Sequence, residues 1–182
     1  MNKKALIILA DGFEEIEAVC VIDILRRALI HTTVCGMDKI IITGSHNIKI
    51  QADKILSEFN QDFDVLILPG GSAGANNLAK SKLVSQFIKK AHHDNKIIAA
   101  ICASPAVVLA PLGILNLKKA TCYPGMENSF PATTEFRKDS VVVDDELITS
   151  RGPATAIEFA LKIAGQLTNE NMAEDLRKKL LA

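Results

Sequence analysis

The chain has 182 residues, of which 48% are hydrophobic, 4% are aromatic and none is tryptophan, and its formal net charge is zero. This length and hydrophobic content suffice for one well-cored domain, so we expect residues 1–182 to form a single domain. The balanced charge excludes electrostatic attraction to nucleic acid or to an anionic membrane, and the scarcity of aromatic side chains excludes a base-stacking surface.

The apolar run near the N-terminus is short, since it follows Lys3 and Lys4 and stops at Asp11. Such a run is too short for a signal-peptide core or a membrane span. The four cysteines lack the spacing of a metal site; they are Cys20, Cys35, Cys102 and Cys122. We therefore expect a cytoplasmic protein without disulfides, metal or cofactor.

The first part of the chain alternates apolar runs with amphipathic segments. Residues 4–9 predict a buried strand, and the turn at 10–13 leads into a helix over 14–30. The expected apolar stripe of this helix includes Phe13, Ile16, Cys20, Ile24 and Leu25. Beyond it we expect a strand at 32–35, a hairpin formed by 39–43 and 48–51, a short helix near Ser57 and a buried strand at 64–68.

The second part continues this alternation. Ser81 is predicted to cap a helix that reaches about residue 94, and residues 96–101 are the next buried strand. The remaining expected elements are a helix at 106–110, a strand at 120–123, a hairpin formed by 140–143 and 146–150, and helices at 154–167 and 172–181. This order predicts an α/β fold, a three-layer α/β/α sandwich with a mainly parallel central sheet and a projecting β-hairpin.

Cys102 stands between a predicted buried strand and a predicted helix. Ser104 is a good N-cap residue and Pro105 suits the first helical position, so the cysteine falls on a tight strand-to-helix turn. This is the geometry of a nucleophile elbow, and a helix N-terminus favours thiolate over thiol. The alternative interpretation is a buried structural cysteine, because free cysteine is among the most buried residue types.

Two other strand ends carry unusual residues. Glu17 falls on or beside the apolar stripe of the first helix, where burial would raise its pKa, unless it is a glutamate at the rim. The glycine turn at Gly70 and Gly71 offers two amides for an oxyanion hole, or is a plain tight turn. Because the carboxyl ends of parallel strands face one crevice, we expect both features to lie beside Cys102.

No histidine stands where a cysteine hydrolase would need its base. The strand after the elbow ends in Cys122 and Tyr123, His31 precedes a strand, and His46 on the hairpin tip reaches the crevice only from a neighbouring subunit. We therefore expect turn amides and Glu17 to activate the thiol, and not an in-chain Cys–His dyad.

Four segments together resemble the ThiJ/PfpI superfamily of class I glutamine amidotransferase-like proteins, and within it the branch of the Parkinson-disease protein and its bacterial relatives. The segments are residues 10–17 (ADGFEEIE), 68–71 (LPGG), 99–105 (AAICASP) and 149–155 (TSRGPAT). The resemblance covers nearly the whole chain. It implies a flavodoxin-like homodimer without a cofactor.

The resemblance also implies roles for individual residues. Cys102 matches the reactive cysteine, and Glu17 matches a buried, protonated glutamate that hydrogen-bonds it. The backbone amides beside the cysteine would come from Gly70, Gly71 and Ala103, while Arg27, Gly152 and Pro153 would lie near the pocket or the subunit interface. The chain departs from many relatives at Tyr123, where they carry histidine, and at His46, where close relatives often carry arginine.

Three functions are compatible with these residues. The first is a carbonyl-stress enzyme, a glyoxalase or deglycase, in which Cys102 attacks a small carbonyl substrate or glycated adduct and Glu17 carries the proton. The second is a redox sensor or redox-regulated chaperone in which Cys102 is oxidised to sulfinate. The third, a cysteine peptidase or amidase, lacks a base. The first two use the same residues, so the sequence does not separate them.

Overall fold

The computed structural model describes residues 3–182, and its centre is a seven-stranded sheet with the order β10-β11-β7-β6-β1-β2-β5. Every neighbouring pair in this sheet is parallel except β10 with β11. The strands are β1 (Lys4–Leu9), β2 (His31–Gly36), β5 (Lys54–Ile55), β6 (Val65–Leu68), β7 (Ile97–Ile101), β10 (Val141–Asp144) and β11 (Leu147–Ser150).

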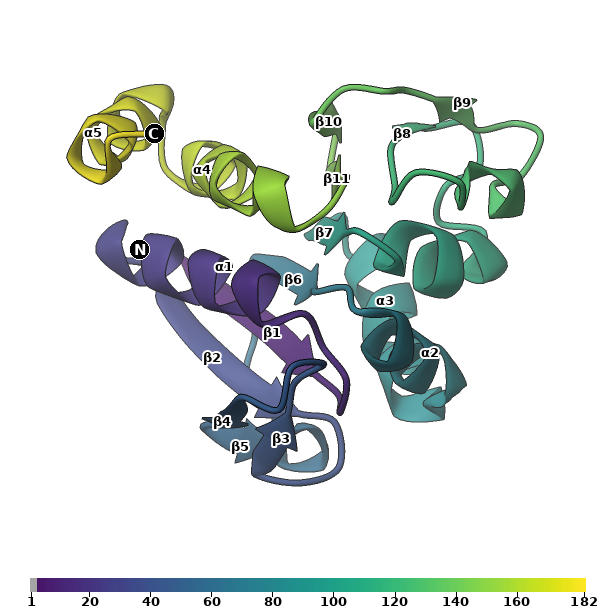
Figure 1. The fold of residues 1–182 in the computed structure, drawn as a ribbon, viewed down its shortest axis with the longest axis horizontal. Coiled ribbons are helices and arrows are strands. Elements are labelled where there is room, and N and C mark those ends of the chain that lie inside the picture. Colours follow the sequence, from purple (N-terminus) through teal and green to yellow (C-terminus); the bar gives the residue numbers. More distant parts are fainter. Residues whose placement is uncertain (1–2) are drawn as a thin grey trace.

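Helices cover both faces of this sheet (Figure 1). On one face α1 (Glu15–Arg27) packs against α4 (Ala156–Leu167), which in turn contacts α5 (Glu170–Leu180). On the other face lie α2 (Ser72–Lys80), α3 (Lys82–His93) and the helical turns over Pro105–Leu109 and Ala110–Leu112. The predicted three-layer α/β/α, flavodoxin-like sandwich with a mainly parallel sheet is confirmed.

The predicted hairpin also forms, and Figure 1 draws it at the end of the molecule where β5 lies. Its strands, β3 (Ile41–Thr43) and β4 (Lys49–Gln51), pair antiparallel in a two-stranded sheet of their own. The amide of Thr43 donates to Asp11 Oδ1 at 2.9 Å, and the Gly12 amide donates to the Thr43 carbonyl at 2.8 Å. The hairpin is therefore fastened to the turn that follows β1.

Two segments beyond β6 differ from the prediction. The helix α2 was not expected, because Gly74, Asn76 and Asn77 are poor helix formers. The strand expected at 120–123 is only β8 (Lys119–Ala120), which pairs with β9 (Glu135–Phe136) outside the main sheet. Beyond β8, the Thr121 amide donates to the Thr149 side chain instead of to a strand partner.

The first helix is shorter than predicted, and part of its expected apolar stripe faces outward. It ends at Arg27, and Leu29 just beyond it has a φ of +59°. Ile16 was expected in the core but is 54% exposed, beside Val19 at 48%. The buried face of α1 is instead made by Ala18, Val21, Ile24 and Leu25, together with Glu15 and Glu17.

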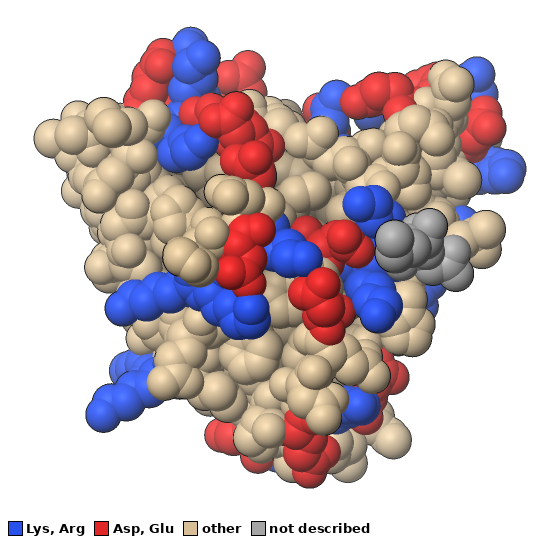
Figure 2. All heavy atoms as spheres, turned by 180° about the vertical axis from the view of Figure 1, so that it is seen from behind, with Lys and Arg blue, Asp and Glu red and all other residues tan. Residues whose placement is uncertain are grey.

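The surface carries mixed charge. On the face shown in Figure 2, acidic and basic side chains are interspersed, with no broad area of one sign. Ion pairs between them include Lys96 with Asp62 at 3.2 Å and Arg26 with Asp53 at 3.4 Å. Within residues 3–182 no helix combines the length and the apolar character that crossing a membrane requires.

Candidate active site

The three strand ends singled out in the sequence do meet. Strands β1, β6 and β7 are neighbours, and the strand order reverses between β1 and β6, which is where ligands bind in open α/β sheets. The loops after β1 and β6 are joined by hydrogen bonds from the Glu14 amide to the Gly70 carbonyl (3.1 Å) and from the Gly74 amide to the Gly12 carbonyl (3.0 Å). Glu17, Gly70 and Cys102 therefore lie in one small region.

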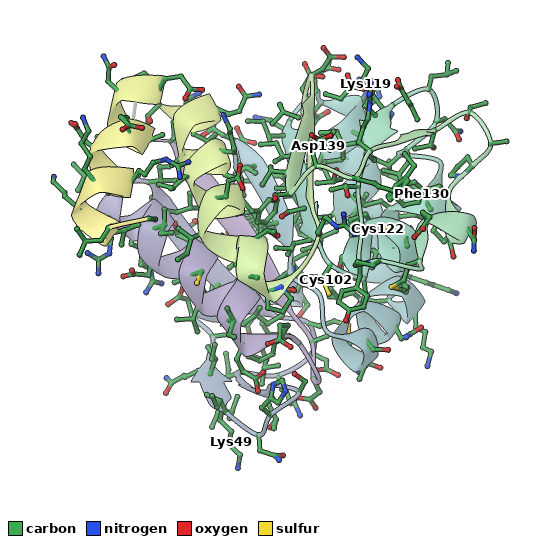
Figure 3. The ribbon with its side chains drawn as sticks, turned by 45° about the horizontal axis from the view of Figure 1, so that its top comes forward. Lys49, Cys102, Lys119, Cys122, Phe130 and Asp139 are labelled. Carbon is green, nitrogen blue, oxygen red and sulfur yellow. The ribbon has the colours of Figure 1, made fainter. Side chains whose placement is uncertain are left out.

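Cys102 occupies a strained backbone position directly after β7 (Figure 3). Its φ is +64°, a left-handed conformation that a residue with a side chain rarely adopts and that is typical of nucleophile elbows. Its amide donates to the Ser150 carbonyl of the neighbouring strand end at 2.9 Å, and the residue is 8% exposed. The sulfur is consequently accessible only to small molecules.

Ser104 does not cap the following helical turn as predicted. Its own φ and ψ are already helical (−63°, −37°), and its side chain makes no capping hydrogen bond. The hydroxyl instead donates to the Pro69 carbonyl oxygen at 2.5 Å, and Ser104 is fully buried. The tight turn at Cys102 brings Ser104 against the end of β6, which is why the cap position is lost.

Only glycine fits at position 70. A Cβ atom there would lie 2.5 Å from Cys102 Cβ and 2.7 Å from Glu17 Oε2. The Gly70 amide donates to Glu17 Oε2 at 2.7 Å. This hydrogen bond leaves it unavailable for the predicted role as an oxyanion donor. Gly71 has a φ of +85°, and its amide and that of Ala103 both lower the pKa of the Cys102 thiol.

Glu17 is fully buried in the first turn of α1, which excludes the rim position that the sequence had left open. Burial raises its pKa, and the hydrogen bonds from Gly70 and Cys102 oppose that rise only in part, leaving the pKa at about 7. The charge of Glu14 raises it further. Its second oxygen, Oε1, has no hydrogen-bond partner within residues 3–182.

The thiol of Cys102 is not shifted in the expected direction. Burial and the charge of ionised Glu17 raise its pKa to about 12, against the lowering effect of the Gly71 and Ala103 amides. Burial also raises the pKa of Cys35 and Cys122 to about 12. An elevated pKa is thus shared by buried cysteines, and what distinguishes Cys102 is its left-handed turn and its contact with Glu17.

Glu17 and Cys102 form a proton-sharing pair. One proton leaves the pair at a pKa of about 7 and the other at about 12, so between these values the pair holds a single proton. Because the carboxyl ionises first, that proton rests mainly on the sulfur, and its transfer to the Glu17 carboxylate produces the reactive form. When it is on Glu17, Cys102 is a thiolate next to a carboxylic acid, which is a nucleophile beside a proton donor.

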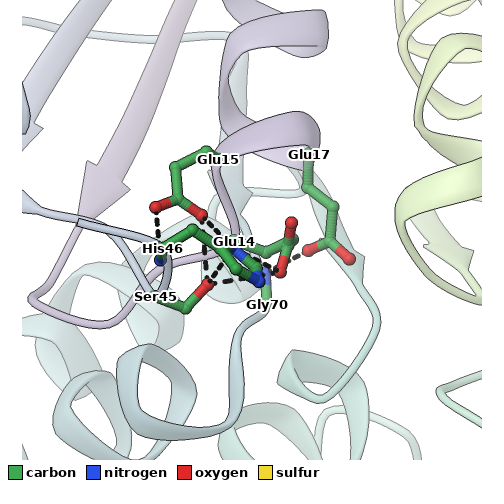
Figure 4. A network of polar contacts seen from close by, with 6 residues as sticks. All are labelled: Glu14, Glu15, Glu17, Ser45, His46 and Gly70. Atoms are coloured by element: carbon green, nitrogen blue, oxygen red, sulfur yellow. Dashed lines mark hydrogen bonds and ion pairs between the residues drawn. The ribbon is translucent and has the colours of Figure 1, made fainter. Parts of the chain in front are cut away.

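His46 lies against its own chain at the N-terminal end of α1 (Figure 4). Its ring Nδ1 is 2.8 Å from Glu15 Oε2, and its amide donates to Glu15 Oε1 at 2.6 Å. The hydrogen bond to Glu15 raises the pKa of His46. Burial raises the pKa of Glu15, but the hydrogen bonds from His46 and Ser45 outweigh it and bring the value to about 2.

Hydrogen bonds account for the close approach of Glu14, Glu15 and His46. The ligand atoms of Glu14, Glu15 and His46 lie within 4.8 Å of one another, a spacing that suits a cation. However, Glu15 already accepts hydrogen bonds from His46 and from the Ser45 hydroxyl (3.0 Å). The cluster fastens the hairpin tip to α1, and no contact joins His46 to Cys102 within residues 3–182.

The other residues predicted at the pocket divide into two groups. The Tyr123 amide donates to the Cys102 carbonyl at 2.8 Å, so Tyr123 adjoins the elbow. A Cβ on Gly152 would lie 3.5 Å from the Tyr123 ring, and Pro153 follows it at the start of a helical turn. Arg27 is ten residues beyond Glu17, about 15 Å along the helix. It pairs with Asp23 on the exposed surface at 2.7 Å and is not brought to Cys102.

Two residues near the site were missed in the sequence. Glu15 was not singled out in the sequence, yet it is 5% exposed and receives the hairpin tip. Its signal was the presence of three glutamates among residues 14–17, more than a helix N-terminus requires. Ser104 was assigned to the wrong partner, because serine before proline is so common at a helix start.

Comparison with known proteins gives a consistent result. The model of the DJ-1/PfpI family matches residues 3–166. Protein dj-1beta of Drosophila melanogaster is 42% identical over all of this chain and 98% of its own length. Glutathione-independent glyoxalase DJR-1.2 of Caenorhabditis elegans is 34% identical over 98% of this chain and 96% of its own. The structure of oxidized Toxoplasma gondii DJ-1 superposes with a TM-score of 0.94 at 40% identity, covering 98% of each chain.

Proposed function

The chain belongs to the DJ-1/PfpI family, and from this premise we propose that it is a cofactor-independent, glutathione-independent glyoxalase or deglycase. The observation that carries the proposal is the buried Glu17, which lies beside a cysteine on a strained elbow. The pKa of Glu17 is about 7. An acid with this pKa both gives and takes a proton at neutral pH. The name of the C. elegans relative supports the same activity.

The proposed reaction converts methylglyoxal and one water molecule to lactate. The Cys102 thiolate attacks the aldehyde carbon, and Glu17 protonates the resulting alkoxide, giving a hemithioacetal on the sulfur. The Glu17 carboxylate then removes the hydrogen from that carbon, giving an enediolate, and returns the proton to the neighbouring carbon. The hydroxyl proton on the first carbon passes to the oxygen of the second, which leaves a lactoyl thioester. Water hydrolyses the thioester, releasing lactate and the thiol, so the overall change is the addition of one water molecule.

In this scheme the Gly70 amide has a different role from the Gly71 and Ala103 amides. The Gly71 and Ala103 amides, which favour the thiolate form of Cys102, are the donors available to the oxygen that develops charge on the adjacent carbon. The Gly70 amide holds Glu17 Oε2, so Oε1 is the oxygen left to exchange a proton with substrate. Because Cys102 is only 8% exposed, the preferred substrate is a small dicarbonyl or the early glycation adduct derived from one.

A second candidate function uses the same residues without turnover. Peroxide would convert the Cys102 thiolate to sulfenate and then sulfinate, whose oxygens would accept hydrogen bonds from protonated Glu17 and the two amides. This would make the protein a redox sensor or redox-regulated chaperone. A peptidase is disfavoured, because His46 contacts Glu15 and not Cys102.

We also propose that the protein is a cytoplasmic homodimer formed from single-domain subunits. Ile16 and Val19 of α1 are 54% and 48% exposed, and Ile157 of the adjoining α4 is 39% exposed. Burying these side chains against a second copy would remove apolar surface from water. A reducing compartment keeps Cys102 in the form that the reaction needs. Light scattering combined with size exclusion tests the dimer.

The test of the enzyme is direct. Purified wild-type protein should consume methylglyoxal and release lactate, and Cys102→Ser prepared in parallel should not. Cys20→Ser is the matched control, since Cys20 is a half-buried cysteine on α1. Equal turnover by wild type and Cys102→Ser would refute the enzyme. Peroxide titration of Cys102 would then test the sensor.

A further inference from the structure

Ser104 is a buried hydroxyl that the proposed reaction does not use. It lies two residues after the nucleophile, is fully buried, and donates to the Pro69 carbonyl oxygen at 2.5 Å. This hydrogen bond crosses from the elbow after β7 to the end of β6. A buried hydroxyl needs a partner, but a structural role alone does not explain why the partner is this carbonyl.

The Pro69 carbonyl belongs to the same peptide group as the Gly70 amide. A trans peptide is planar, and its C=O and N–H point in opposite directions. Ser104 holds the oxygen end of this group, and its hydrogen end donates to Glu17 Oε2 at 2.7 Å. One rigid unit therefore connects the Ser104 hydroxyl with the Glu17 carboxyl.

Two consequences follow for Glu17. Fixing the plane of this peptide fixes which carboxyl oxygen accepts the amide, so the proton of Glu17 resides on Oε1, the oxygen with no partner within residues 3–182. Donation to the carbonyl oxygen also polarises the peptide and strengthens donation from its N–H. A stronger hydrogen bond to the carboxylate favours the ionised form of Glu17.

We propose that Ser104 is a positioning residue for the reaction, acting through the Pro69–Gly70 peptide to orient Glu17 and to favour its ionised form. This inference rests on the proposed function, since it concerns the same Cys102–Glu17 pair. The groups that titrate around Glu17 are Cys102 from the elbow and Glu14 from its own helix. Ser104→Ala leaves both in place.

The experiment measures the rate of Cys102 alkylation by iodoacetamide from pH 5 to 10. In wild type the rate should rise through the first ionisation of the pair, near pH 7. Ser104→Ala should move this rise upward by about half a pH unit, the effect of losing one hydrogen bond of ordinary strength. Ser104→Thr, which keeps the hydroxyl, should restore the wild-type profile.

Two controls separate positioning from general loosening. Thr32 on the distant strand β2 also has a buried hydroxyl, which donates to the Ile30 carbonyl at 3.1 Å. Thr32→Val removes this hydroxyl and should not move the pH profile of alkylation. In a Glu17→Gln background, Ser104→Ala should also have no effect, because it acts only through Glu17. A shift of equal size in both backgrounds would overturn the proposal.

The outcomes also separate this inference from the proposed function. If wild type and Glu17→Gln show the same profile, Glu17 is not coupled to Cys102, and both the proton carrier and the role of Ser104 are refuted. If these two differ while Ser104→Ala matches wild type, the coupling stands and the positioning role is refuted.

Discussion

Replacing Glu17 by glutamine should remove a specific dependence of stability on pH. The pKa of Glu17 rises from its ordinary value of 4.5 to about 7 in the folded protein, mainly because the side chain is buried. The folded state therefore holds this proton more tightly than the unfolded state does. The stability that this proton confers is fully present below pH 4.5 and is lost as the pH rises through 7.

The magnitude follows from the same shift. At about 1.4 kcal/mol for each unit of pKa, wild type should lose about 3 kcal/mol of unfolding free energy through Glu17 between pH 4.5 and pH 8. The Gln variant has no group to titrate there. Its stability relative to wild type should therefore increase by about that amount over the same range.

Urea denaturation at half-unit steps of pH measures this difference. Other titrating groups are common to both proteins, so their contributions cancel in the comparison. Glu174→Gln, which replaces a glutamate with a 56% exposed side chain on α5, serves as the control for the substitution itself. A difference between wild type and Glu17→Gln that stays constant with pH would show that Glu17 is not the buried acid described here.

Three other predictions concern the surroundings of the pair. Gly70→Ala would place a methyl group 2.5 Å from Cys102 Cβ, so it should cost about 1–3 kcal/mol in urea denaturation and suppress alkylation, whereas Gly165→Ala in α4 should do neither. His46→Ala should speed amide exchange in the hairpin at low pH more than at high pH, because the Glu15 partner raises the His46 pKa and the pair is lost as pH rises through it; equal effects at both extremes would contradict this. Limited peroxide should add two oxygen atoms to Cys102 ahead of the other cysteines, as peptide mass spectrometry would show; uniform oxidation would contradict it.

The main features of the fold were predictable because they follow from local patterns. Apolar runs such as those of β1 and β6 are long enough to mark buried strands, and their alternation with amphipathic segments fixes a parallel sheet. The convergence of Glu17, Gly70 and Cys102 then follows from the rule that parallel strands end at one edge. What the sequence predicts well is therefore which residues meet.

The details of their contacts were less predictable. Ile16 faces outward although it fits a helical apolar stripe, since periodicity does not show which apolar face a helix turns to the sheet. The partner of Ser104 depends on the left-handed turn at Cys102, which no local propensity indicates. The direction of the Cys102 pKa depends on burial and on a charge 85 residues away in the chain, that of Glu17.

The most direct test of the central claim is to expose the Glu17→Gln protein to methylglyoxal and examine it by intact-mass and peptide mass spectrometry while measuring lactate. If Cys102 is the nucleophile and Glu17 carries the proton between carbons, this variant should retain one methylglyoxal on Cys102 and release little or no lactate, whereas wild type releases lactate continuously. Lactate formation by Glu17→Gln at the wild-type rate would contradict the account, because the proton would then be moved by another group.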